Sequence, residues 1–158
     1  MISPKTVIGH IHLRVSNIDR SLLFYRDILG FDVVTRMGED AVFLSAGGYH
    51  HHIGLNTWES RGATPPPPGH TGMYHFAILL PSRKELANTL KTLVNADYPI
   101  GGASDHGVSE AVYLEDPDGN GIELYWDRPK KEWPKDKNGD LAMTLAPLDL
   151  TKLLKEAD

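Results

Sequence analysis

The sequence predicts an α+β protein made of two βαβββ modules, whose strands form one open, strongly curved, barrel-like mixed sheet with helices outside and an extra C-terminal helix. One order of elements, a strand, a helix and three strands, can be read twice along the 158 residues. A module of about 50 residues cannot bury both faces of its sheet, so two modules must share a surface. We therefore expect a single domain over residues 1–158, with modules at about 7–58 and 73–127, a linker at about 59–72 and a tail at 128–158.

The first module begins with an alternating, β-branched run, Val7–Val15, which is typical of a strand. Asn17 or Asp19 can cap the helix that follows, and Gly30 ends it. Three more strands are predicted, at Phe31–Arg36, Ala41–Ala46 and Tyr49–Trp58. A stiff, extended connector containing four consecutive prolines follows this module.

The second module repeats this order from the apolar strand Tyr74–Leu80. Ser82 and Glu85 fit a capping box, which predicts the start of a helix. We expect three further strands, a short one near Pro99–Ile100 and two longer ones at Glu110–Leu114 and Gly121–Trp126, the last two joined by the turn Asp116–Asn120. The tail ends in a predicted amphipathic helix, Leu148–Glu156.

Composition excludes several classes of function. The net charge is −5 and no basic run occurs, so we expect neither nucleic-acid binding nor membrane binding. The absence of cysteine excludes disulfides, zinc-thiolate sites and cysteine nucleophiles. No apolar stretch approaches the ~18 residues of a membrane span, and the first residues lack the apolar core of a signal peptide. We expect a cytoplasmic protein.

Eight histidines make a metal site the leading chemical hypothesis; they occupy positions 10, 12, 50, 51, 52, 70, 75 and 106. The repeat places His10 and His75 at matching points in the first strands of the two modules. Glu123 lies between apolar neighbours near the end of the last predicted strand. The fourth strands of the two modules match at an offset of about 70 positions, at which Glu123 corresponds to Ile53. Two imidazoles and one carboxylate leave open positions on a metal, as in Fe(II) enzymes that bind a substrate and O₂ together. Each residue alone is also compatible with a structural role, and His12 shares a strand face with His10; the repeat favours His10.

Three further residues are candidates for catalysis. If Ile53 faces the same cavity as Glu123, strand alternation places His51 there too, as a general acid or base. Tyr113 lies on the strand before that of Glu123, where its hydroxyl can reach a substrate oxygen. His106 belongs to a Gly/Ser-rich segment, Gly101–Gly107, that we expect to be a loop over the site. A buried structural tyrosine and a solvated histidine are the alternatives.

Two other motifs do not support a function. Asp116–Gly121 matches the opening of a calcium-binding loop, but Asp127 stands where a bidentate Glu is needed and strands flank it in place of helices. No Gly-rich phosphate loop precedes a helix, and no serine nucleophile elbow is present.

Four segments together resemble the paired modules of the vicinal oxygen chelate superfamily, and they are Gly9–Val15, Ser21–Phe31, Tyr74–Ala77 and Val112–Glu123. The resemblance covers about residues 7–127 and is strongest to type I extradiol (catechol 2,3-) dioxygenases. It implies metal ligands at His10, His75 and Glu123. It also implies an acid/base histidine at His51, an active-site tyrosine at Tyr113 and a loop histidine at His106. Many such enzymes carry two module pairs, whereas this chain has one.

The resemblance implies a catechol-like substrate, O₂ and a divalent metal, with Fe(II) expected first and Mn(II), Ni(II) or Zn(II) able to occupy the same ligands. It also implies a homodimer. Two alternatives remain open on the same scaffold. One is a glyoxalase, lyase, epimerase or fosfomycin-resistance-type transferase; glyoxalase I usually adds a Glu ligand at the place of Ile53. The other is a metal-free binding or resistance module, which generally lacks the His/His/Glu set.

Overall fold

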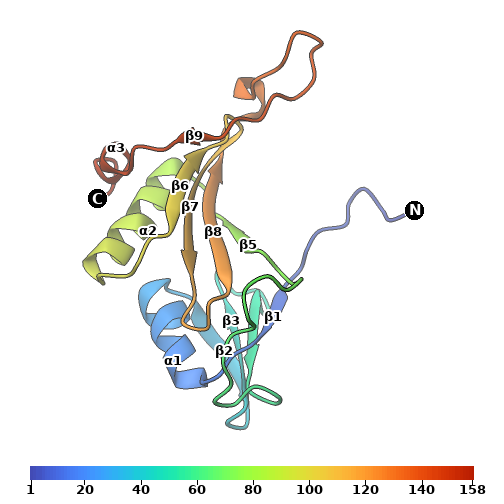
Figure 1. Cartoon of the computed structure of the whole chain (residues 1–158), viewed down its shortest axis with the longest axis vertical. Coiled ribbons are helices and arrows are strands. Elements are labelled where there is room, and N and C mark those ends of the chain that lie inside the picture. Colours follow the sequence, from blue (N-terminus) through green and yellow to red (C-terminus); the bar gives the residue numbers. More distant parts are fainter. The chain divides into compact units, whose positions relative to one another are not determined.

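The computed structural model describes residues 1–158 as two compact units, Met1–Pro67 (unit 1) and Pro68–Asp158 (unit 2). The boundary between them lies inside the predicted linker. Each unit holds one mixed sheet with helices on one face, and each repeats the order strand, helix, strand, strand, strand (Figure 1). The α+β class is therefore confirmed. The strands form two sheets, one in each unit, and neither sheet closes into a barrel.

Unit 1 contains a four-stranded sheet in the order β1-β4-β3-β2, in which only β1 and β4 are parallel. Its strands are β1 (Ile11–Arg14), β2 (Asp32–Met37), β3 (Ala41–Ser45) and β4 (Ile53–Asn56). The first and fourth strands are shorter than predicted. The helix starts as expected at the Asn17 cap, whose side chain accepts from the Arg20 amide at 2.9 Å. It consists of α1 (Ile18–Leu22) followed by a π-helical turn, η1 (Leu23–Ile28).

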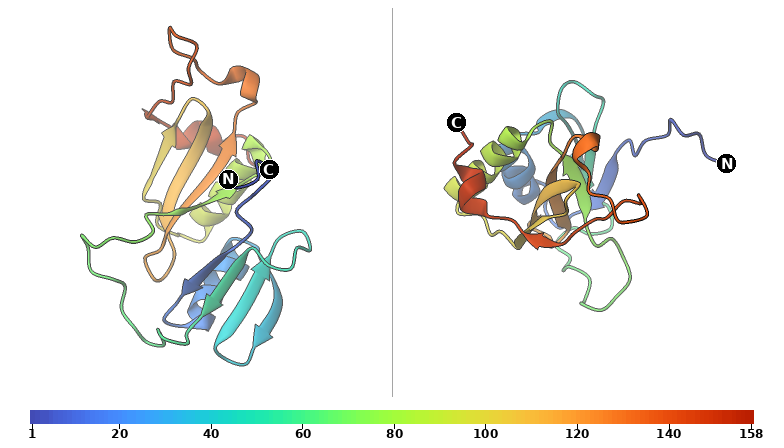
Figure 2. Two further views of the ribbon diagram at one scale, coloured as in Figure 1. Left: turned by 90° about the vertical axis from the view of Figure 1, so that its right-hand side faces the viewer. Right: turned by 90° about the horizontal axis from the view of Figure 1, so that it is seen from above.

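Unit 2 contains a five-stranded sheet in the order β5-β8-β7-β6-β9, with β5 and β8 parallel. Its strands are β5 (Phe76–Leu79), β6 (Gly102–Asp105), β7 (Ser109–Glu115), β8 (Gly121–Asp127) and β9 (Ala146–Pro147). Helix α2 (Arg83–Asn95) covers one face of this sheet (Figure 2). The Ser82 hydroxyl caps α2 by accepting from the Glu85 amide at 3.2 Å, as the capping box predicted.

Two predictions for unit 2 were wrong in position. The short strand is not at Pro99–Ile100 but at β6, so most of the segment expected to be a loop before His106 is a strand. Pairing of β6 with both β7 and the tail strand β9 explains this, because Gly and Ser have little strand preference of their own.

The tail returns to unit 2 and packs on it. After a 3₁₀ turn, η2 (Lys130–Glu132), the chain forms β9 at the sheet edge and then α3 (Leu150–Leu154) beside α2. This helix is shorter than predicted, and its Leu153 is fully buried. No helix of either unit is both long enough and apolar enough to span a membrane.

Burial alternates along β1 and along the first part of β8, and there it separates two faces of the sheet. In β1 Leu13 is buried while its neighbours His12 and Arg14 are exposed. In β8 Ile122 and Leu124 are buried, whereas Glu123 between them is only partly covered. The buried face of each sheet packs on its helices, and the opposite face carries the polar candidates.

Candidate active site

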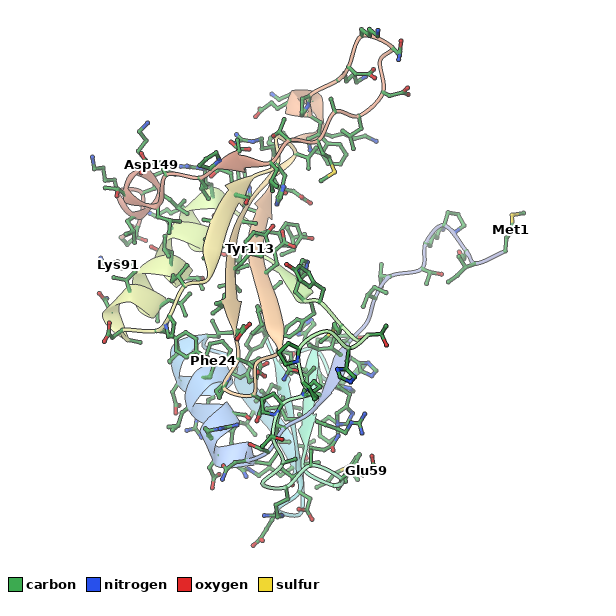
Figure 3. The ribbon with its side chains drawn as sticks, viewed as in Figure 1. Met1, Phe24, Glu59, Lys91, Tyr113 and Asp149 are labelled. Carbon is green, nitrogen blue, oxygen red and sulfur yellow. The ribbon has the colours of Figure 1, made fainter.

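In unit 2, a run of hydrogen bonds starts at Glu123. The β7–β8 register places Tyr113 directly opposite Glu123, on the same face of the sheet. The Tyr113 hydroxyl donates to Glu123 Oε1 at 3.2 Å, and His75 Nε2 lies 3.0 Å from Glu123 Oε2. Only 14% of the Glu123 side chain is exposed. Figure 3 labels Tyr113 on this sheet. The carboxylate is thus held between an imidazole and a phenol.

His106 extends this run toward the tail. Its Nε2 lies 2.6 Å from the Tyr113 hydroxyl and its Nδ1 lies 3.1 Å from the Thr144 carbonyl. A carbonyl only accepts, so Nδ1 carries a proton, and Nε2 of the neutral ring is an acceptor. The tail is fixed in turn, since the Thr144 amide donates to the His106 carbonyl and its hydroxyl donates to the Asp105 carbonyl. His106 is therefore oriented from both sides.

The pKa of Tyr113 is raised to about 12, first by burial and then by the negative charge and hydrogen bond of Glu123. Near neutral pH its hydroxyl keeps its proton. Because Glu123 and His106 Nε2 can both accept this single proton, Tyr113 can donate to one or the other. The residue is suited to hold a proton at a defined place.

In unit 1, the predicted histidines form an aromatic cluster. The His10 and His51 rings are 4.3 Å apart, and His51 packs edge-on against Phe43 at 5.1 Å. The two Nδ1 atoms of His50 and His51 lie 2.8 Å apart, so one must donate and the other accept. Partial burial and then the nearby His10 and other histidine charges lower the pKa of His51. The neutral imidazole is favoured, and a neutral ring has one nitrogen that can take a proton.

His12 and His52 have other neighbours. His12 packs between Phe43 and Trp58, with ring centroids 5.7 and 5.6 Å away, and burial followed by the charge of His10 lowers its pKa. His52 Nδ1 lies 3.2 Å from the Ser45 hydroxyl. Of the three consecutive histidines, His51 is the one whose ring lies against His10.

The strand register corrects one sequence inference. Ile11 pairs with Ile53 in unit 1, and Phe76 pairs with Ile122 in unit 2. Ile53 therefore corresponds to Ile122, and both are buried, at 2% and 1% exposure. The residue that corresponds to Glu123 is Gly54, not Ile53. The alternation argument for His51 fails with it, because the three histidines precede β4 and are not part of a strand.

A cavity of about 920 Å³ opens beside the unit 2 residues. His75 and Tyr113 line it, together with a wall from the segment Tyr98–Gly101 and the tail residue Leu145. Glu123 lies between His75 and Tyr113 in the hydrogen-bond run. The hydrogen-bonded run of His75, Glu123, Tyr113 and His106, called the polar run below, thus borders a space large enough for a small aromatic molecule.

The donor atoms of unit 2 suit a divalent metal. Two donors about 2.1 Å from one cation and at right angles to each other lie roughly 3.0 Å apart. The separation of His75 Nε2 from Glu123 Oε2 has this value, and imidazole with carboxylate is a common donor set. Within each unit, no three His, Asp or Glu side chains are grouped so that they hold a metal ion.

A model of the Glyoxalase/Bleomycin resistance protein/Dioxygenase superfamily matches residues 7–124. The chain belongs to this superfamily. A catechol-2,3-dioxygenase of Bacillus subtilis (strain 168) is 43% identical over 157 residues, which are 99% of this chain and 54% of that protein. A manganese-dependent 2,3-dihydroxybiphenyl 1,2-dioxygenase of Geobacillus genomosp. 3 is 29% identical over 84% of this chain and 40% of its own. The chain spans about half the length of these two relatives.

Solved structures of the superfamily share the fold. A glyoxalase/dioxygenase of Nostoc punctiforme superposes with a TM-score of 0.66 at 20% identity, covering 82% of this chain and 97% of its own. A lactoylglutathione lyase of Agrobacterium tumefaciens superposes with a TM-score of 0.60 at 24% identity, covering 78% and 96%. At these identities the likeness concerns the fold alone.

The structure groups the predicted site residues of this chain in two sets. His75, Glu123, Tyr113 and His106 form one hydrogen-bonded run in unit 2, and His10 and His51 are ring neighbours in unit 1. Sequence reasoning missed Thr144, which orients His106 from the tail. No local pattern marks such a residue, because the contact joins positions 38 apart.

Proposed function

We propose that this protein is an extradiol dioxygenase that uses a divalent metal and O₂ to cleave the ring of a catechol-type diol. The observation that carries the proposal is the hydrogen-bonded run from His75 through Glu123 and Tyr113 to His106, beside a cavity of suitable size. The 43% identity to a protein named catechol-2,3-dioxygenase supports the same reaction.

We propose His10, His75 and Glu123 as the ligands of the metal. The His75–Glu123 geometry supports two of them, and His10 is the residue that the internal repeat pairs with His75. Fe(II) is the metal expected first, and Mn(II) is the second choice because one relative is named as manganese-dependent. When bound, the metal supplies a Lewis-acidic centre with open positions for both substrates.

Protein side chains then move and hold protons. His51, kept neutral, takes a proton from one diol hydroxyl at Nε2 and later returns it. Tyr113 presents its hydroxyl to an oxygen of the substrate, and His106 fixes the direction of that hydroxyl. The cavity walls orient the ring and exclude water.

The glyoxalase alternative is less well supported. The register places Gly54 where that enzyme's additional carboxylate ligand is expected, and glycine offers no side chain.

The proposed assembly is a cytoplasmic homodimer. Light scattering after size-exclusion chromatography measures its mass and so tests whether it is a dimer.

The decisive experiment is anaerobic reconstitution with Fe(II) or Mn(II), followed by exposure of a catechol panel to O₂. We expect ring-fission products that absorb in the near ultraviolet or visible range. A colourless result across simple and substituted catechols would overturn the proposal.

Matched variants test the roles. His75→Ala, Glu123→Gln and His10→Ala should each weaken metal binding, as measured by calorimetry, while His70→Ala in the linker should not. His51→Ala should retain the metal and lower turnover by roughly 10²-fold or more. Loss of metal in His51→Ala would make it a ligand instead.

A further inference from the structure

Several residues that line the cavity of unit 2 are aromatic or aliphatic. They come from three segments of the chain, and the residues of this apolar wall are Tyr74, Tyr98, Pro99, Ile100 and Leu145. The Tyr98 hydroxyl donates to the Glu115 carbonyl at 2.8 Å, which fixes the ring in the wall. Leu145 comes from the tail just before β9, which pairs with β6.

The acidic and basic residues that line the cavity are of one sign, apart from His75. Glu115 and Asp116 are among the lining residues, and no lysine or arginine is. Glu115 lies two residues beyond Tyr113 on β7, so strand alternation places it on the same face as the polar run. Asp116 is buried, and its Oδ1 accepts from the amides of Asp118 and Asn120 at 2.8 and 2.9 Å. A ligand in this cavity therefore meets apolar surface and negative charge.

A carboxylate on the ligand would be disfavoured here for two reasons. It would lose water without gaining a lysine or arginine as a partner, and it would be repelled by Glu115. An alkyl or aryl group gains instead from burial, which strengthens binding roughly fourfold for each methylene removed from water. The lining thus discriminates by charge more than by size.

We propose that this cavity selects catechols whose ring substituent is uncharged and apolar, and that it rejects catechols bearing a carboxylate. The inference rests on the proposed dioxygenase function for the position of the diol, which lies against His75 and Tyr113. The substituent then points along the apolar wall, and Glu115 is the residue that determines specificity against anions.

The test uses two catechols of nearly equal size, 4-ethylcatechol and 3,4-dihydroxyphenylacetate, with the metal-reconstituted protein. We expect kcat/KM for the ethyl compound to exceed that for the acid at least about tenfold. Anaerobic calorimetry of both compounds measures binding without turnover and should give the same order. Equal binding of the two compounds would overturn the proposal.

Charge variants locate the selectivity. Glu115→Gln should reduce the ethyl-to-acid ratio and Glu115→Lys should reduce it further, by about tenfold in total. The control Glu132→Lys changes the net charge equally at a tail position outside the cavity lining and should leave the ratio unchanged. A ratio unaffected by Glu115→Lys would also overturn the proposal.

The two proposals fail differently. If neither catechol is cleaved, the proposed reaction is wrong, and calorimetry still decides the selectivity of the cavity. If both are cleaved at equal kcat/KM, the reaction stands and the selectivity is wrong.

Discussion

Replacing Glu110 with alanine should destabilise unit 2 by about 3 kcal/mol. Its side chain is only 5% exposed, and its two oxygens accept from Arg83 Nε and Arg128 Nη2, both at 2.7 Å. A hydrogen bond to a charged group is worth about 1.5–3 kcal/mol, so two give an upper range of roughly 3–6 kcal/mol. Both arginines remain 25% exposed and keep acidic partners, Arg128 with Asp105 at 2.7 Å and Arg83 with Glu156. Partial rehydration therefore places the loss near the lower end.

Urea denaturation followed by tryptophan fluorescence measures this loss. With a slope of about 2 kcal/mol/M, the midpoint should fall by roughly 1.5 M. Glu59→Ala is the matched control, because Glu59 pairs with Arg14 at 3.3 Å while both side chains are at least 70% exposed. Figure 3 labels Glu59 at the surface of unit 1. The control should cost less than about 1 kcal/mol. Equal small losses for both variants would refute the argument that burial gives the Glu110 cluster its strength.

Three further outcomes are expected. Arg61 lowers the pKa of the Asp40 carboxyl by a side-chain hydrogen bond. The contribution of this carboxylate to stability is therefore present above its usual pKa of 3.8 and is lost as the pH falls through the lowered pKa. Arg61→Ala should raise the Asp40 pKa toward 3.8 in an NMR titration. Leu153→Ala should cost about 2–5 kcal/mol in urea denaturation, since this side chain is fully buried. Tyr113→Phe should lower turnover of the reconstituted enzyme roughly 10²-fold while calorimetry shows unchanged metal affinity, because the hydroxyl is lost and Glu123 remains.

Local signals allowed the element order and the helix starts to be predicted from sequence. Asn17 and Ser82 each cap a helix because a short polar side chain before an apolar stripe satisfies a free amide, and both bonds are observed. The repeat of strand, helix and three strands is likewise a sum of local preferences. These features depend on neighbours within a few positions.

Register and edge pairing could not be obtained in this way. The first strands of the two units match at an offset of 65 and the fourth strands at 69, as Ile11–Phe76 and Ile53–Ile122 show. One residue of error in the second offset exchanged the two faces of β4. The strand β6 was misplaced because its order comes from β7 and β9, which lie elsewhere in the sequence.

The corrected register explains why the two units differ in chemistry although they share a fold. In unit 2 the open face carries Ala77, Glu123 and Tyr113 side by side across three strands. The corresponding positions in unit 1 are His12, Gly54 and Phe43.

The His12 ring lies over Gly54, where an added Cβ would meet the imidazole at 3.0 Å. The imidazole thus occupies the space that a carboxylate side chain on β4 would need, and Ala77 leaves the same space free for Glu123 in unit 2. A side chain at position 54 would thus press on the His12 ring, whereas the small Ala77 places no such ring beside Glu123. The fold can therefore place a carboxylate between its parallel strands in one unit, while the other unit presents imidazoles.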